Sequence, residues 1–209
     1  MKRGRANIDD SAYPLFVTTT ITDFIPVFRD PVLARSALEL FERQRQLHDM
    51  TIYAYVLMLN HFHAIARASH RGETSRFIGA WKSLTAQIVI DSVSGEWRSA
   101  FADAARTYGE PKRKQHKVWV SRFDDVALYT PEVFGVKLEY IHGNPVRAGL
   151  VECAEDYAYS SARFCATGEG LVCSIDRLSP ALGRQCCREC GRTGRSGPGS
   201  AQGLTRTEP

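Results

Sequence analysis

Two histidines separated by one residue are the first reactive pattern in the sequence. His61 and His63 lie within the run NHFH, which begins at Asn60. The apolar residues around them predict a strand, and side chains two positions apart on a strand point to the same face. Two imidazoles on one face can bind a single divalent ion. A His-x-His pair alone is a weak signal, because a buried histidine is more often a hydrogen-bonded core residue than a ligand.

A second pattern combines a tyrosine with an asparagine. In the run YIHGNP, Tyr140 and Asn144 are four residues apart and share one face if the segment is helical. An amide oxygen is a suitable ligand for Mg²⁺ or Mn²⁺, and a phenol beside a metal-bound phosphate can act as a nucleophile. The competing structural interpretation of Tyr140 is a half-buried aromatic on an amphipathic helix. Because Pro145 disfavours the α conformation at Asn144, we expect Asn144 at the helix end.

A basic run, PKRKQHK, precedes the apolar segment VWVSRF. Exposed cations of this kind suit the phosphates of nucleic acid. The cations of this run are Lys112, Arg113, Lys114 and Lys117. Trp119, directly behind the run, could stack on a base, but its apolar neighbours favour a place in the core. For Arg147 two interpretations stay open: contact with a phosphate, or pairing with a surface carboxylate.

The elements that must position these residues follow from apolar periodicity and from capping residues. Asp30 followed by Pro31 is an N-cap signal for a helix over 31–47, and Thr130 followed by Pro131 is the same signal for a helix over 131–143 that Pro145 stops. Further helices are predicted over 75–90 and 97–106. Strands are predicted over 15–21, over the continuous apolar run 51–68, and over 118–123 with a continuation at 126–130. This order predicts an α+β domain, an antiparallel sheet flanked by helices.

Composition sets the extent of the folded domain. The chain has 209 residues, of which 44% are hydrophobic, and this fraction excludes global disorder. Its net charge of +4 suits the binding of nucleic acid. The apolar runs are too short to span a bilayer, and no secretory signal precedes them, so we expect no membrane partner. The 10 Phe, 8 Tyr and 3 Trp residues all lie at or before Phe164. We therefore predict one domain over 8–166 and a weakly structured, Gly- and Arg-rich tail over 167–209.

The cysteines indicate a reducing compartment. All 6 lie in the last third of the chain, which is not the distribution of a disulfide framework. Cys187 and Cys190 form a lone C-x-x-C pair with no second pair to complete a zinc site. A cytoplasmic location and free thiols are therefore expected.

Four segments together resemble a known family. The runs AYVLMLNHFHAI, VWVSRF, EYIHGNPVRAGLV and DYAYSSARF occur in the order found in the REP-associated tyrosine transposases, which are single-tyrosine HUH transposases. The resemblance covers about residues 10–166 and leaves the tail unmatched. Leu59 stands where the family commonly has proline, and the stretch 91–116 is longer than usual. Neither departure falls on a candidate catalytic position.

The resemblance implies a role for each candidate residue. His61 and His63 would match the two metal-binding histidines, Tyr140 the nucleophile, and Asn144 the third ligand of a Mg²⁺ or Mn²⁺ ion. The implied fold is ferredoxin-like, similar to RNA-recognition domains. The implied substrate is single-stranded or hairpin DNA in a bacterial cytoplasm, cut to give a 5′-phosphotyrosine and a free 3′-hydroxyl. Whether the protein works as a monomer or as a homodimer stays open.

Two other functions compete with this enzyme. One is a catalytically idle DNA-hairpin binding protein derived from such a transposase. The other is a metal-dependent nucleotide hydrolase with a histidine nucleophile, but the run HFHAIA lacks the third alternate histidine of such a site. The presence of His61, His63, Tyr140 and Asn144 together favours the strand-transferring enzyme.

Overall fold

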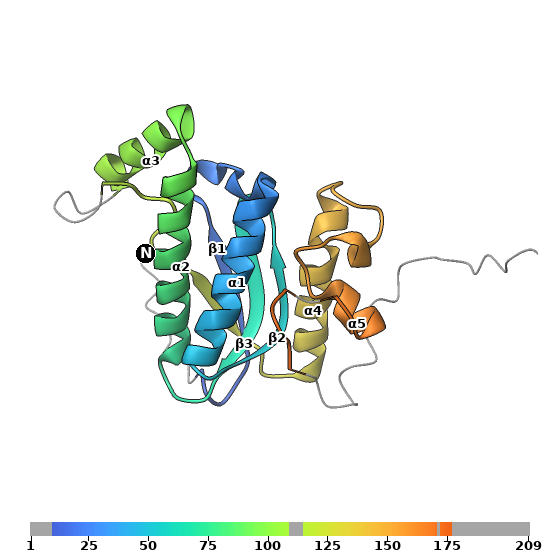
Figure 1. Cartoon of the computed structure of the whole chain (residues 1–209). Coiled ribbons are helices and arrows are strands. Elements are labelled where there is room, and N and C mark those ends of the chain that lie inside the picture. Colours follow the sequence, from blue (N-terminus) through green and yellow to red (C-terminus); the bar gives the residue numbers. More distant parts are fainter. Residues whose placement is uncertain (1–9, 109–114, 171, 177–209) are drawn as a thin grey trace, which may run out of the picture.

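A four-stranded antiparallel sheet with helices on both faces forms the body of the chain (Figure 1). The computed structural model describes residues 10–108, 115–170 and 172–176. The strands are β1 (Leu15–Thr20), β2 (Met50–Leu57), β3 (His61–Ala68) and β4 (Asp124–Ala127). The helices are α1 (Pro31–Leu47), α2 (Glu73–Ser92), α3 (Gly95–Tyr108), α4 (Pro131–Arg147) and α5 (Ala162–Thr167). Short 3-10 turns lie at Thr22–Phe24, Val27–Arg29 and Ala154–Asp156.

The strand order across the sheet is β2-β3-β1-β4. Each neighbouring pair is antiparallel. Together with α1 and α2, these strands follow one another as β-α-β-β-α-β, which is the ferredoxin-like arrangement. The predicted α+β fold with an antiparallel sheet is therefore confirmed. The sheet separates α1 and α2 on one face from α4 on the other (Figure 1).

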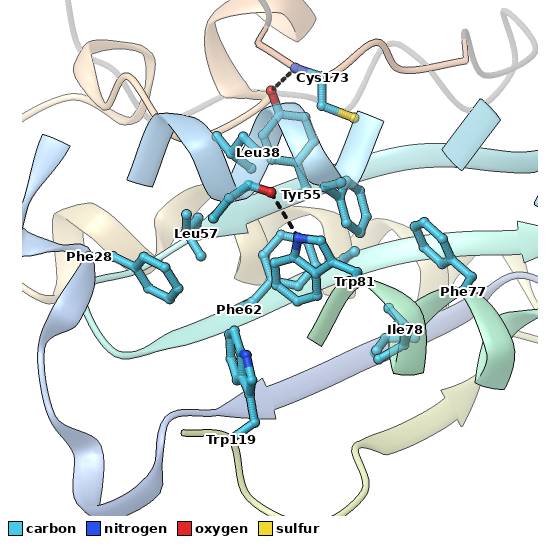
Figure 2. Packing of buried hydrophobic residues seen from close by; sticks show 14 of the residues in the cluster. Phe28, Leu38, Tyr55, Leu57, Phe62, Phe77, Ile78, Trp81, Trp119 and Cys173 are labelled. Atoms are coloured by element: carbon cyan, nitrogen blue, oxygen red, sulfur yellow. Dashed lines mark hydrogen bonds between the residues drawn. The ribbon is translucent and has the colours of Figure 1, made fainter. Parts of the chain in front are cut away.

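The larger core lies between the sheet and the helices α1 and α2. Phe62 of β3 points to this side and contacts Trp81 of α2 (Figure 2). Phe62 also contacts Phe41 of α1. The indole of Trp81 donates to the carbonyl of Ala37 at 2.8 Å, so its one polar atom is satisfied inside the core. Trp119 packs against Trp81 with ring centroids 5.1 Å apart. This core position leaves Trp119 unable to stack on a base.

The helices begin where the capping residues predicted. The Asp30 carboxylate accepts from the backbone N–H of Val32 at 2.8 Å and starts α1 at Pro31. The Thr130 hydroxyl accepts from the N–H of Val133 at 3.4 Å and starts α4. Within the described ranges, no helix combines the length and the apolar character needed to cross a bilayer.

The run 51–68, predicted as one strand, is instead a hairpin of β2 and β3. The chain turns at Met58–Asn60, where the Met58 N–H donates to the carbonyl of His61 at 2.8 Å. The prediction was wrong because the turn contains neither glycine nor proline, and apolar residues continue through it. Val56 consequently lies opposite His63. Tyr55, which a continuous strand would place on the histidines' face, points instead into the core under α1.

The segment VWVSRF contributes only one bridge to the sheet, between Trp119 and Ile21. The regular fourth strand, β4, begins at Asp124. Arg122 has φ of 78°, a left-handed conformation that interrupts the extended backbone between the two parts. The predicted strand over 118–123 is therefore wrong. Its predicted continuation over 126–130 includes the end of β4, Val126 and Ala127.

Pro145 does not stop α4, which continues to Arg147. Proline removes only its own N–H from the helix, and the following turn is held by the Ala148 N–H, which donates to the Asn144 carbonyl at 3.0 Å. Gly149, with φ of 66°, then ends the helix in a left-handed conformation. The prediction that the helix ends at 143 is thus wrong. As a result, Asn144 and Arg147 stand on the same regular helix as Tyr140.

The packed part of the chain reaches Asp176. Cys173 is fully buried, and its N–H donates to the hydroxyl of Tyr55 at 3.2 Å. The N–H of Asp176 donates to the carbonyl of Ile52 at 2.7 Å, and its carboxylate accepts from the Ile52 N–H at 2.9 Å. Residues 172–176 therefore belong with the body, beyond the predicted boundary at 166. The remainder of the predicted tail, 177–209, lies outside the described residues, and with it Cys186, Cys187 and Cys190.

These contacts predict how truncation affects stability. A chain ending at Gly183 keeps the contacts described here for residues 172–176, so its free energy of unfolding should match that of the full chain. A chain ending at Gly170 loses the Cys173 burial and the bonds to Ile52, and should lose about 2 kcal/mol or more. Urea denaturation followed by circular dichroism measures both. Equal stability of the two truncated chains would contradict the assignment of residues 172–176 to the core.

Candidate active site on the histidine face

The candidate site lies where β1, β3 and α4 meet, on the sheet face opposite α1 and α2. Alternation along β3 sends Phe62 to the larger core and His61 and His63 to the α4 side. The register of β1 with β3 places Thr18 opposite His63. Tyr140 reaches the same place from α4. The fold thus joins the two patterns that the sequence shows far apart.

Four aromatic rings make direct contact in this site. The ring centroids of His61 and His63 are 4.9 Å apart, and those of His63 and Tyr140 are 5.4 Å apart. Phe16 of β1 stacks on His63 at 5.4 Å and meets Tyr140 edge-on at 5.9 Å. The His63 side chain is almost buried, at 5% exposure, whereas Tyr140 is 41% exposed. The phenol is therefore accessible to a large ligand while the histidine beneath it is held in place.

Hydrogen bonds fix the orientation of both imidazoles. The Asn60 amide nitrogen donates to the Phe24 carbonyl at 2.9 Å, which leaves the Asn60 oxygen to accept from Nδ1 of His61 at 2.7 Å. His61 is thereby set in the tautomer whose Nε2 carries a lone pair. Nδ1 of His63 shares a 2.8 Å hydrogen bond with the Thr18 hydroxyl. Within the described residues, neither Nε2 is engaged by a hydrogen bond.

The surroundings keep both histidines uncharged. Burial lowers the pKa of His61. Burial lowers the pKa of His63 to about 3, together with the mutual repulsion of His61 and His63 when both are protonated and the positive charges of Lys137 and Arg147. Both rings are therefore neutral at pH 7, the state in which imidazole binds a metal. The pair fits two coordination positions of one divalent ion.

Asn144 lies one turn beyond Tyr140 on α4. Its amide nitrogen donates a hydrogen bond to the Tyr140 carbonyl at 2.9 Å. The amide oxygen is therefore left available to coordinate a metal ion. In the described part of the chain, no three His, Cys, Asp or Glu side chains are arranged to hold a metal. The groups that contact the imidazoles are the Asn60 amide, the Thr18 hydroxyl and the rings of Phe16 and Tyr140, and among the described residues no hydrogen bond joins Asn144 to either histidine.

The predicted DNA-binding cations do not form one group in the structure. Arg147 lies at the site, with its guanidinium carbon 4.7 Å from the centre of the Tyr140 ring. Lys117 lies beside α3, where its ammonium donates to the Tyr108 carbonyl at 2.9 Å. Lys112, Arg113 and Lys114 lie outside the described residues.

Three residues of the site were not singled out from the sequence: Phe16, Thr18 and Lys137. Phe16 and Thr18 join the site only through the register of β1 with β3, for which the sequence carries no local signal. Lys137 could have been identified as a site residue from the sequence, because it precedes Tyr140 by three positions on a predicted helix and so shares its face.

Comparisons with known proteins bear on the fold. No protein-family model and no curated protein matches the chain. Among solved structures, a REP-associated tyrosine transposase bound to a REP hairpin matches with a TM-score of 0.54 and 17% identity, over 86% of this chain and 93% of that chain. A putative transposase from Deinococcus radiodurans matches with a TM-score of 0.39 and 16% identity, over 68% of this chain and 97% of that chain. The chain shares the fold of the first structure, as the sequence resemblance implied.

The hydrogen bond between Thr18 and His63 predicts a measurable effect on stability. Thr18→Val keeps the shape of the side chain but leaves Nδ1 of the almost buried His63 without its partner. The free energy of unfolding should fall by about 1–2 kcal/mol in urea denaturation. Thr20→Val, the same change on the same face of β1, is the control, because within the described residues the Thr20 hydroxyl makes no hydrogen bond. Equal losses in the two variants would argue against a specific role of Thr18.

Proposed function

We propose that the protein is a metal-dependent enzyme that cuts and rejoins single-stranded or hairpin DNA through a covalent bond to Tyr140. One observation carries the proposal: two neutral histidines and an accessible tyrosine meet in one site, with the Tyr140 ring 5.4 Å from that of His63. Metal-binding nitrogens beside a phenol are the groups needed to attack a phosphodiester. The resemblance of the sequence to tyrosine transposases supports the same reaction.

The proposed reaction exchanges one phosphate ester for another. The phenolic oxygen of Tyr140 attacks the phosphorus, the bond from phosphorus to the 3′ oxygen breaks, and a 5′-phosphotyrosine forms. The phenolic proton leaves to water, and the departing 3′ oxygen takes up a proton to become a hydroxyl. Attack of a 3′-hydroxyl on the phosphotyrosine reverses the exchange, so rejoining needs no nucleotide cofactor.

His61 and His63 are the residues that would hold a divalent ion, Mg²⁺ or Mn²⁺, with the amide oxygen of Asn144 as a further donor. Such an ion would reduce the negative charge of the phosphate and so favour attack by an oxygen nucleophile. The roles of Asn60 and Thr18 follow from their bonds to Nδ1, because they orient the rings and leave Nε2 toward the ligand.

Single-stranded or hairpin DNA fits the exposed side of the site. The register pairs Phe16 with Val126 of β4, and Val126 is 48% exposed, so the sheet beside Tyr140 is open on the α4 face. The solved structure with the same fold contains a REP hairpin, which supports a hairpin ligand for this chain.

A catalytically idle hairpin-binding protein is the competing candidate. Two observations favour it: the Asn144 side chain bonds to its own helix, and the described residues include no group of three His, Cys, Asp or Glu side chains that could hold a metal. Both candidates bind DNA, so only covalent attachment separates them.

Substitution of the tyrosine tests the proposal directly. Tyr140→Phe removes only the hydroxyl, so folding and DNA binding should be retained while the covalent adduct disappears. Labelled single-stranded DNA with Mn²⁺, resolved on a denaturing gel, measures the adduct. Tyr129→Phe, an exposed tyrosine just before α4, is the control and should give the adduct at the unmodified rate. An adduct mapped by mass spectrometry to any other tyrosine would refute the role of Tyr140.

The metal assignment has its own test. The double change His61→Ala and His63→Ala should abolish adduct formation and weaken Mn²⁺ binding at least 10-fold, because two ligands are lost. Isothermal titration with Mn²⁺ measures binding, and circular dichroism checks the fold. His70→Ala, an exposed histidine after β3, should leave both unchanged. Adduct formation at the unmodified rate by the double variant would exclude His61 and His63 as metal ligands.

A further inference from the structure

Two cations stand beside Tyr140 on the same helix. Lys137 precedes the tyrosine by three residues and Arg147 follows it by seven. At about 100° per residue, these positions lie about 60° and 20° from Tyr140 around the helix axis. Because α4 continues regularly through Pro145, all three side chains emerge on one side of it.

Both cations touch the aromatic rings of the site. The Lys137 ammonium is 4.6 Å from the centre of the Phe16 ring and 5.6 Å from that of Tyr140. The Arg147 guanidinium lies 4.7 Å from the centre of the Tyr140 ring and donates to the Tyr140 carbonyl. The contacts are cation–π contacts, which leave most N–H groups free to donate elsewhere.

Neither charge is paired with a carboxylate among the residues that the structure describes. In the described part of the chain, Lys137 and Arg147 form no ion pair, whereas other cations pair with carboxylates. The paired cations are Arg35, Arg45, Arg76 and Arg106. The register places Asp124 opposite Thr18 at the exposed edge of the sheet, but it bonds to neither cation.

The two cations lie on the same rings that contact the histidines. Phe16 contacts His63 as well as Lys137, and Tyr140 contacts His63 as well as both cations. Two cations, two imidazoles and a phenol therefore lie together, and no carboxylate of the described residues forms an ion pair with either cation. The positive charge of these groups favours the binding of an anion at the site.

We infer that Lys137 and Arg147 together bind the phosphate group that Tyr140 attacks, so that Lys137 is a second phosphate-binding cation of the site. The inference rests on the proposed function and names the substrate contact that positions the reaction. The ammonium of Lys137 acts as a point charge on one non-bridging oxygen, and the planar fork of Arg147 donates to another. Held by both, the phosphate lies beside the phenol and the histidines before the attack begins.

The test separates the charge of Lys137 from its packing. Lys137→Met keeps the apolar stem on Phe16 but removes the charge, whereas Lys137→Arg keeps the charge. Arg35→Ala, on α1 across the sheet, removes the same charge far from the site and is the matched control. We expect Lys137→Met to slow adduct formation with single-stranded DNA at least 10-fold, Lys137→Arg to restore most of the rate, and Arg35→Ala to match the unmodified protein.

Salt dependence supplies a readout that packing alone does not move. In the Tyr140→Phe background, where no adduct forms, fluorescence anisotropy gives the affinity for a labelled single strand at several salt concentrations. Lys137→Met should reduce the slope of log affinity against log salt by about 0.7, the value for one phosphate contact on a single strand. Unchanged slope and unchanged adduct rate in Lys137→Met would overturn the inference.

The outcomes distinguish this inference from the proposed function. If the unmodified protein forms the adduct and Lys137→Met forms it equally fast, only the inference fails. If the unmodified protein binds single strands without an adduct, the proposed reaction fails, and the salt slope still decides whether Lys137 contacts a phosphate. If the unmodified protein binds no single-stranded DNA, both fail.

Discussion

The pairing of β1 with β3 is the constraint on which the site depends. β3 is buried on both faces: Phe62 anchors the core under α1 and α2, while His63 points to α4. A slip of one residue would exchange these faces and bury the histidines among Phe41 and Trp81. The same register brings the Thr18 hydroxyl to Nδ1 of His63. The hydrophobic core therefore also selects which histidine nitrogen is presented to a ligand.

The second half of the site is fixed by how α4 lies on the sheet. Its buried positions Phe134, Leu138 and Ile141 recur with helical spacing and pack on Ile65 and Val56. Tyr140 stands at the margin of this stripe, so packing holds its backbone while its ring stays partly exposed. His142, on the buried side, bonds through Nε2 to the Ser161 hydroxyl at 2.9 Å, and Ser161 bonds to the backbone of Tyr55 in β2. The tyrosine helix is thereby tied to the sheet that carries the histidines.

The electrostatics of the site suit the anionic substrate that we propose. Neutral imidazoles can ligate a divalent ion, yet the nearby cations Lys137 and Arg147 oppose the binding of a cation alone. A phosphodiester would resolve this conflict, because it would pair with the cations and offer its oxygens to the ion. By linkage, metal and DNA are then expected to strengthen each other's binding. Among the described residues neither imidazole bonds to a carboxylate, which suits a substrate that brings the negative charge itself.

The sequence by itself determined the features that depend on interactions between residues close together along the chain. The caps at Asp30 and Thr130 set the starts of α1 and α4, because a side chain bonds to a backbone N–H within the same turn. Alternation placed His61 and His63 on one face, and helical spacing placed Tyr140 near Asn144. The sequence could not separate β2 from β3, since apolar residues run through the turn at Met58–Asn60, nor foresee that α4 would accommodate Pro145. Only the tertiary structure decided the contacts of Thr18 and Phe16 with His63 and the packing of Cys173 on Tyr55. These contacts depend on strand register and long-range packing, which arise from the summed burial of many residues and leave no mark on any short stretch of chain.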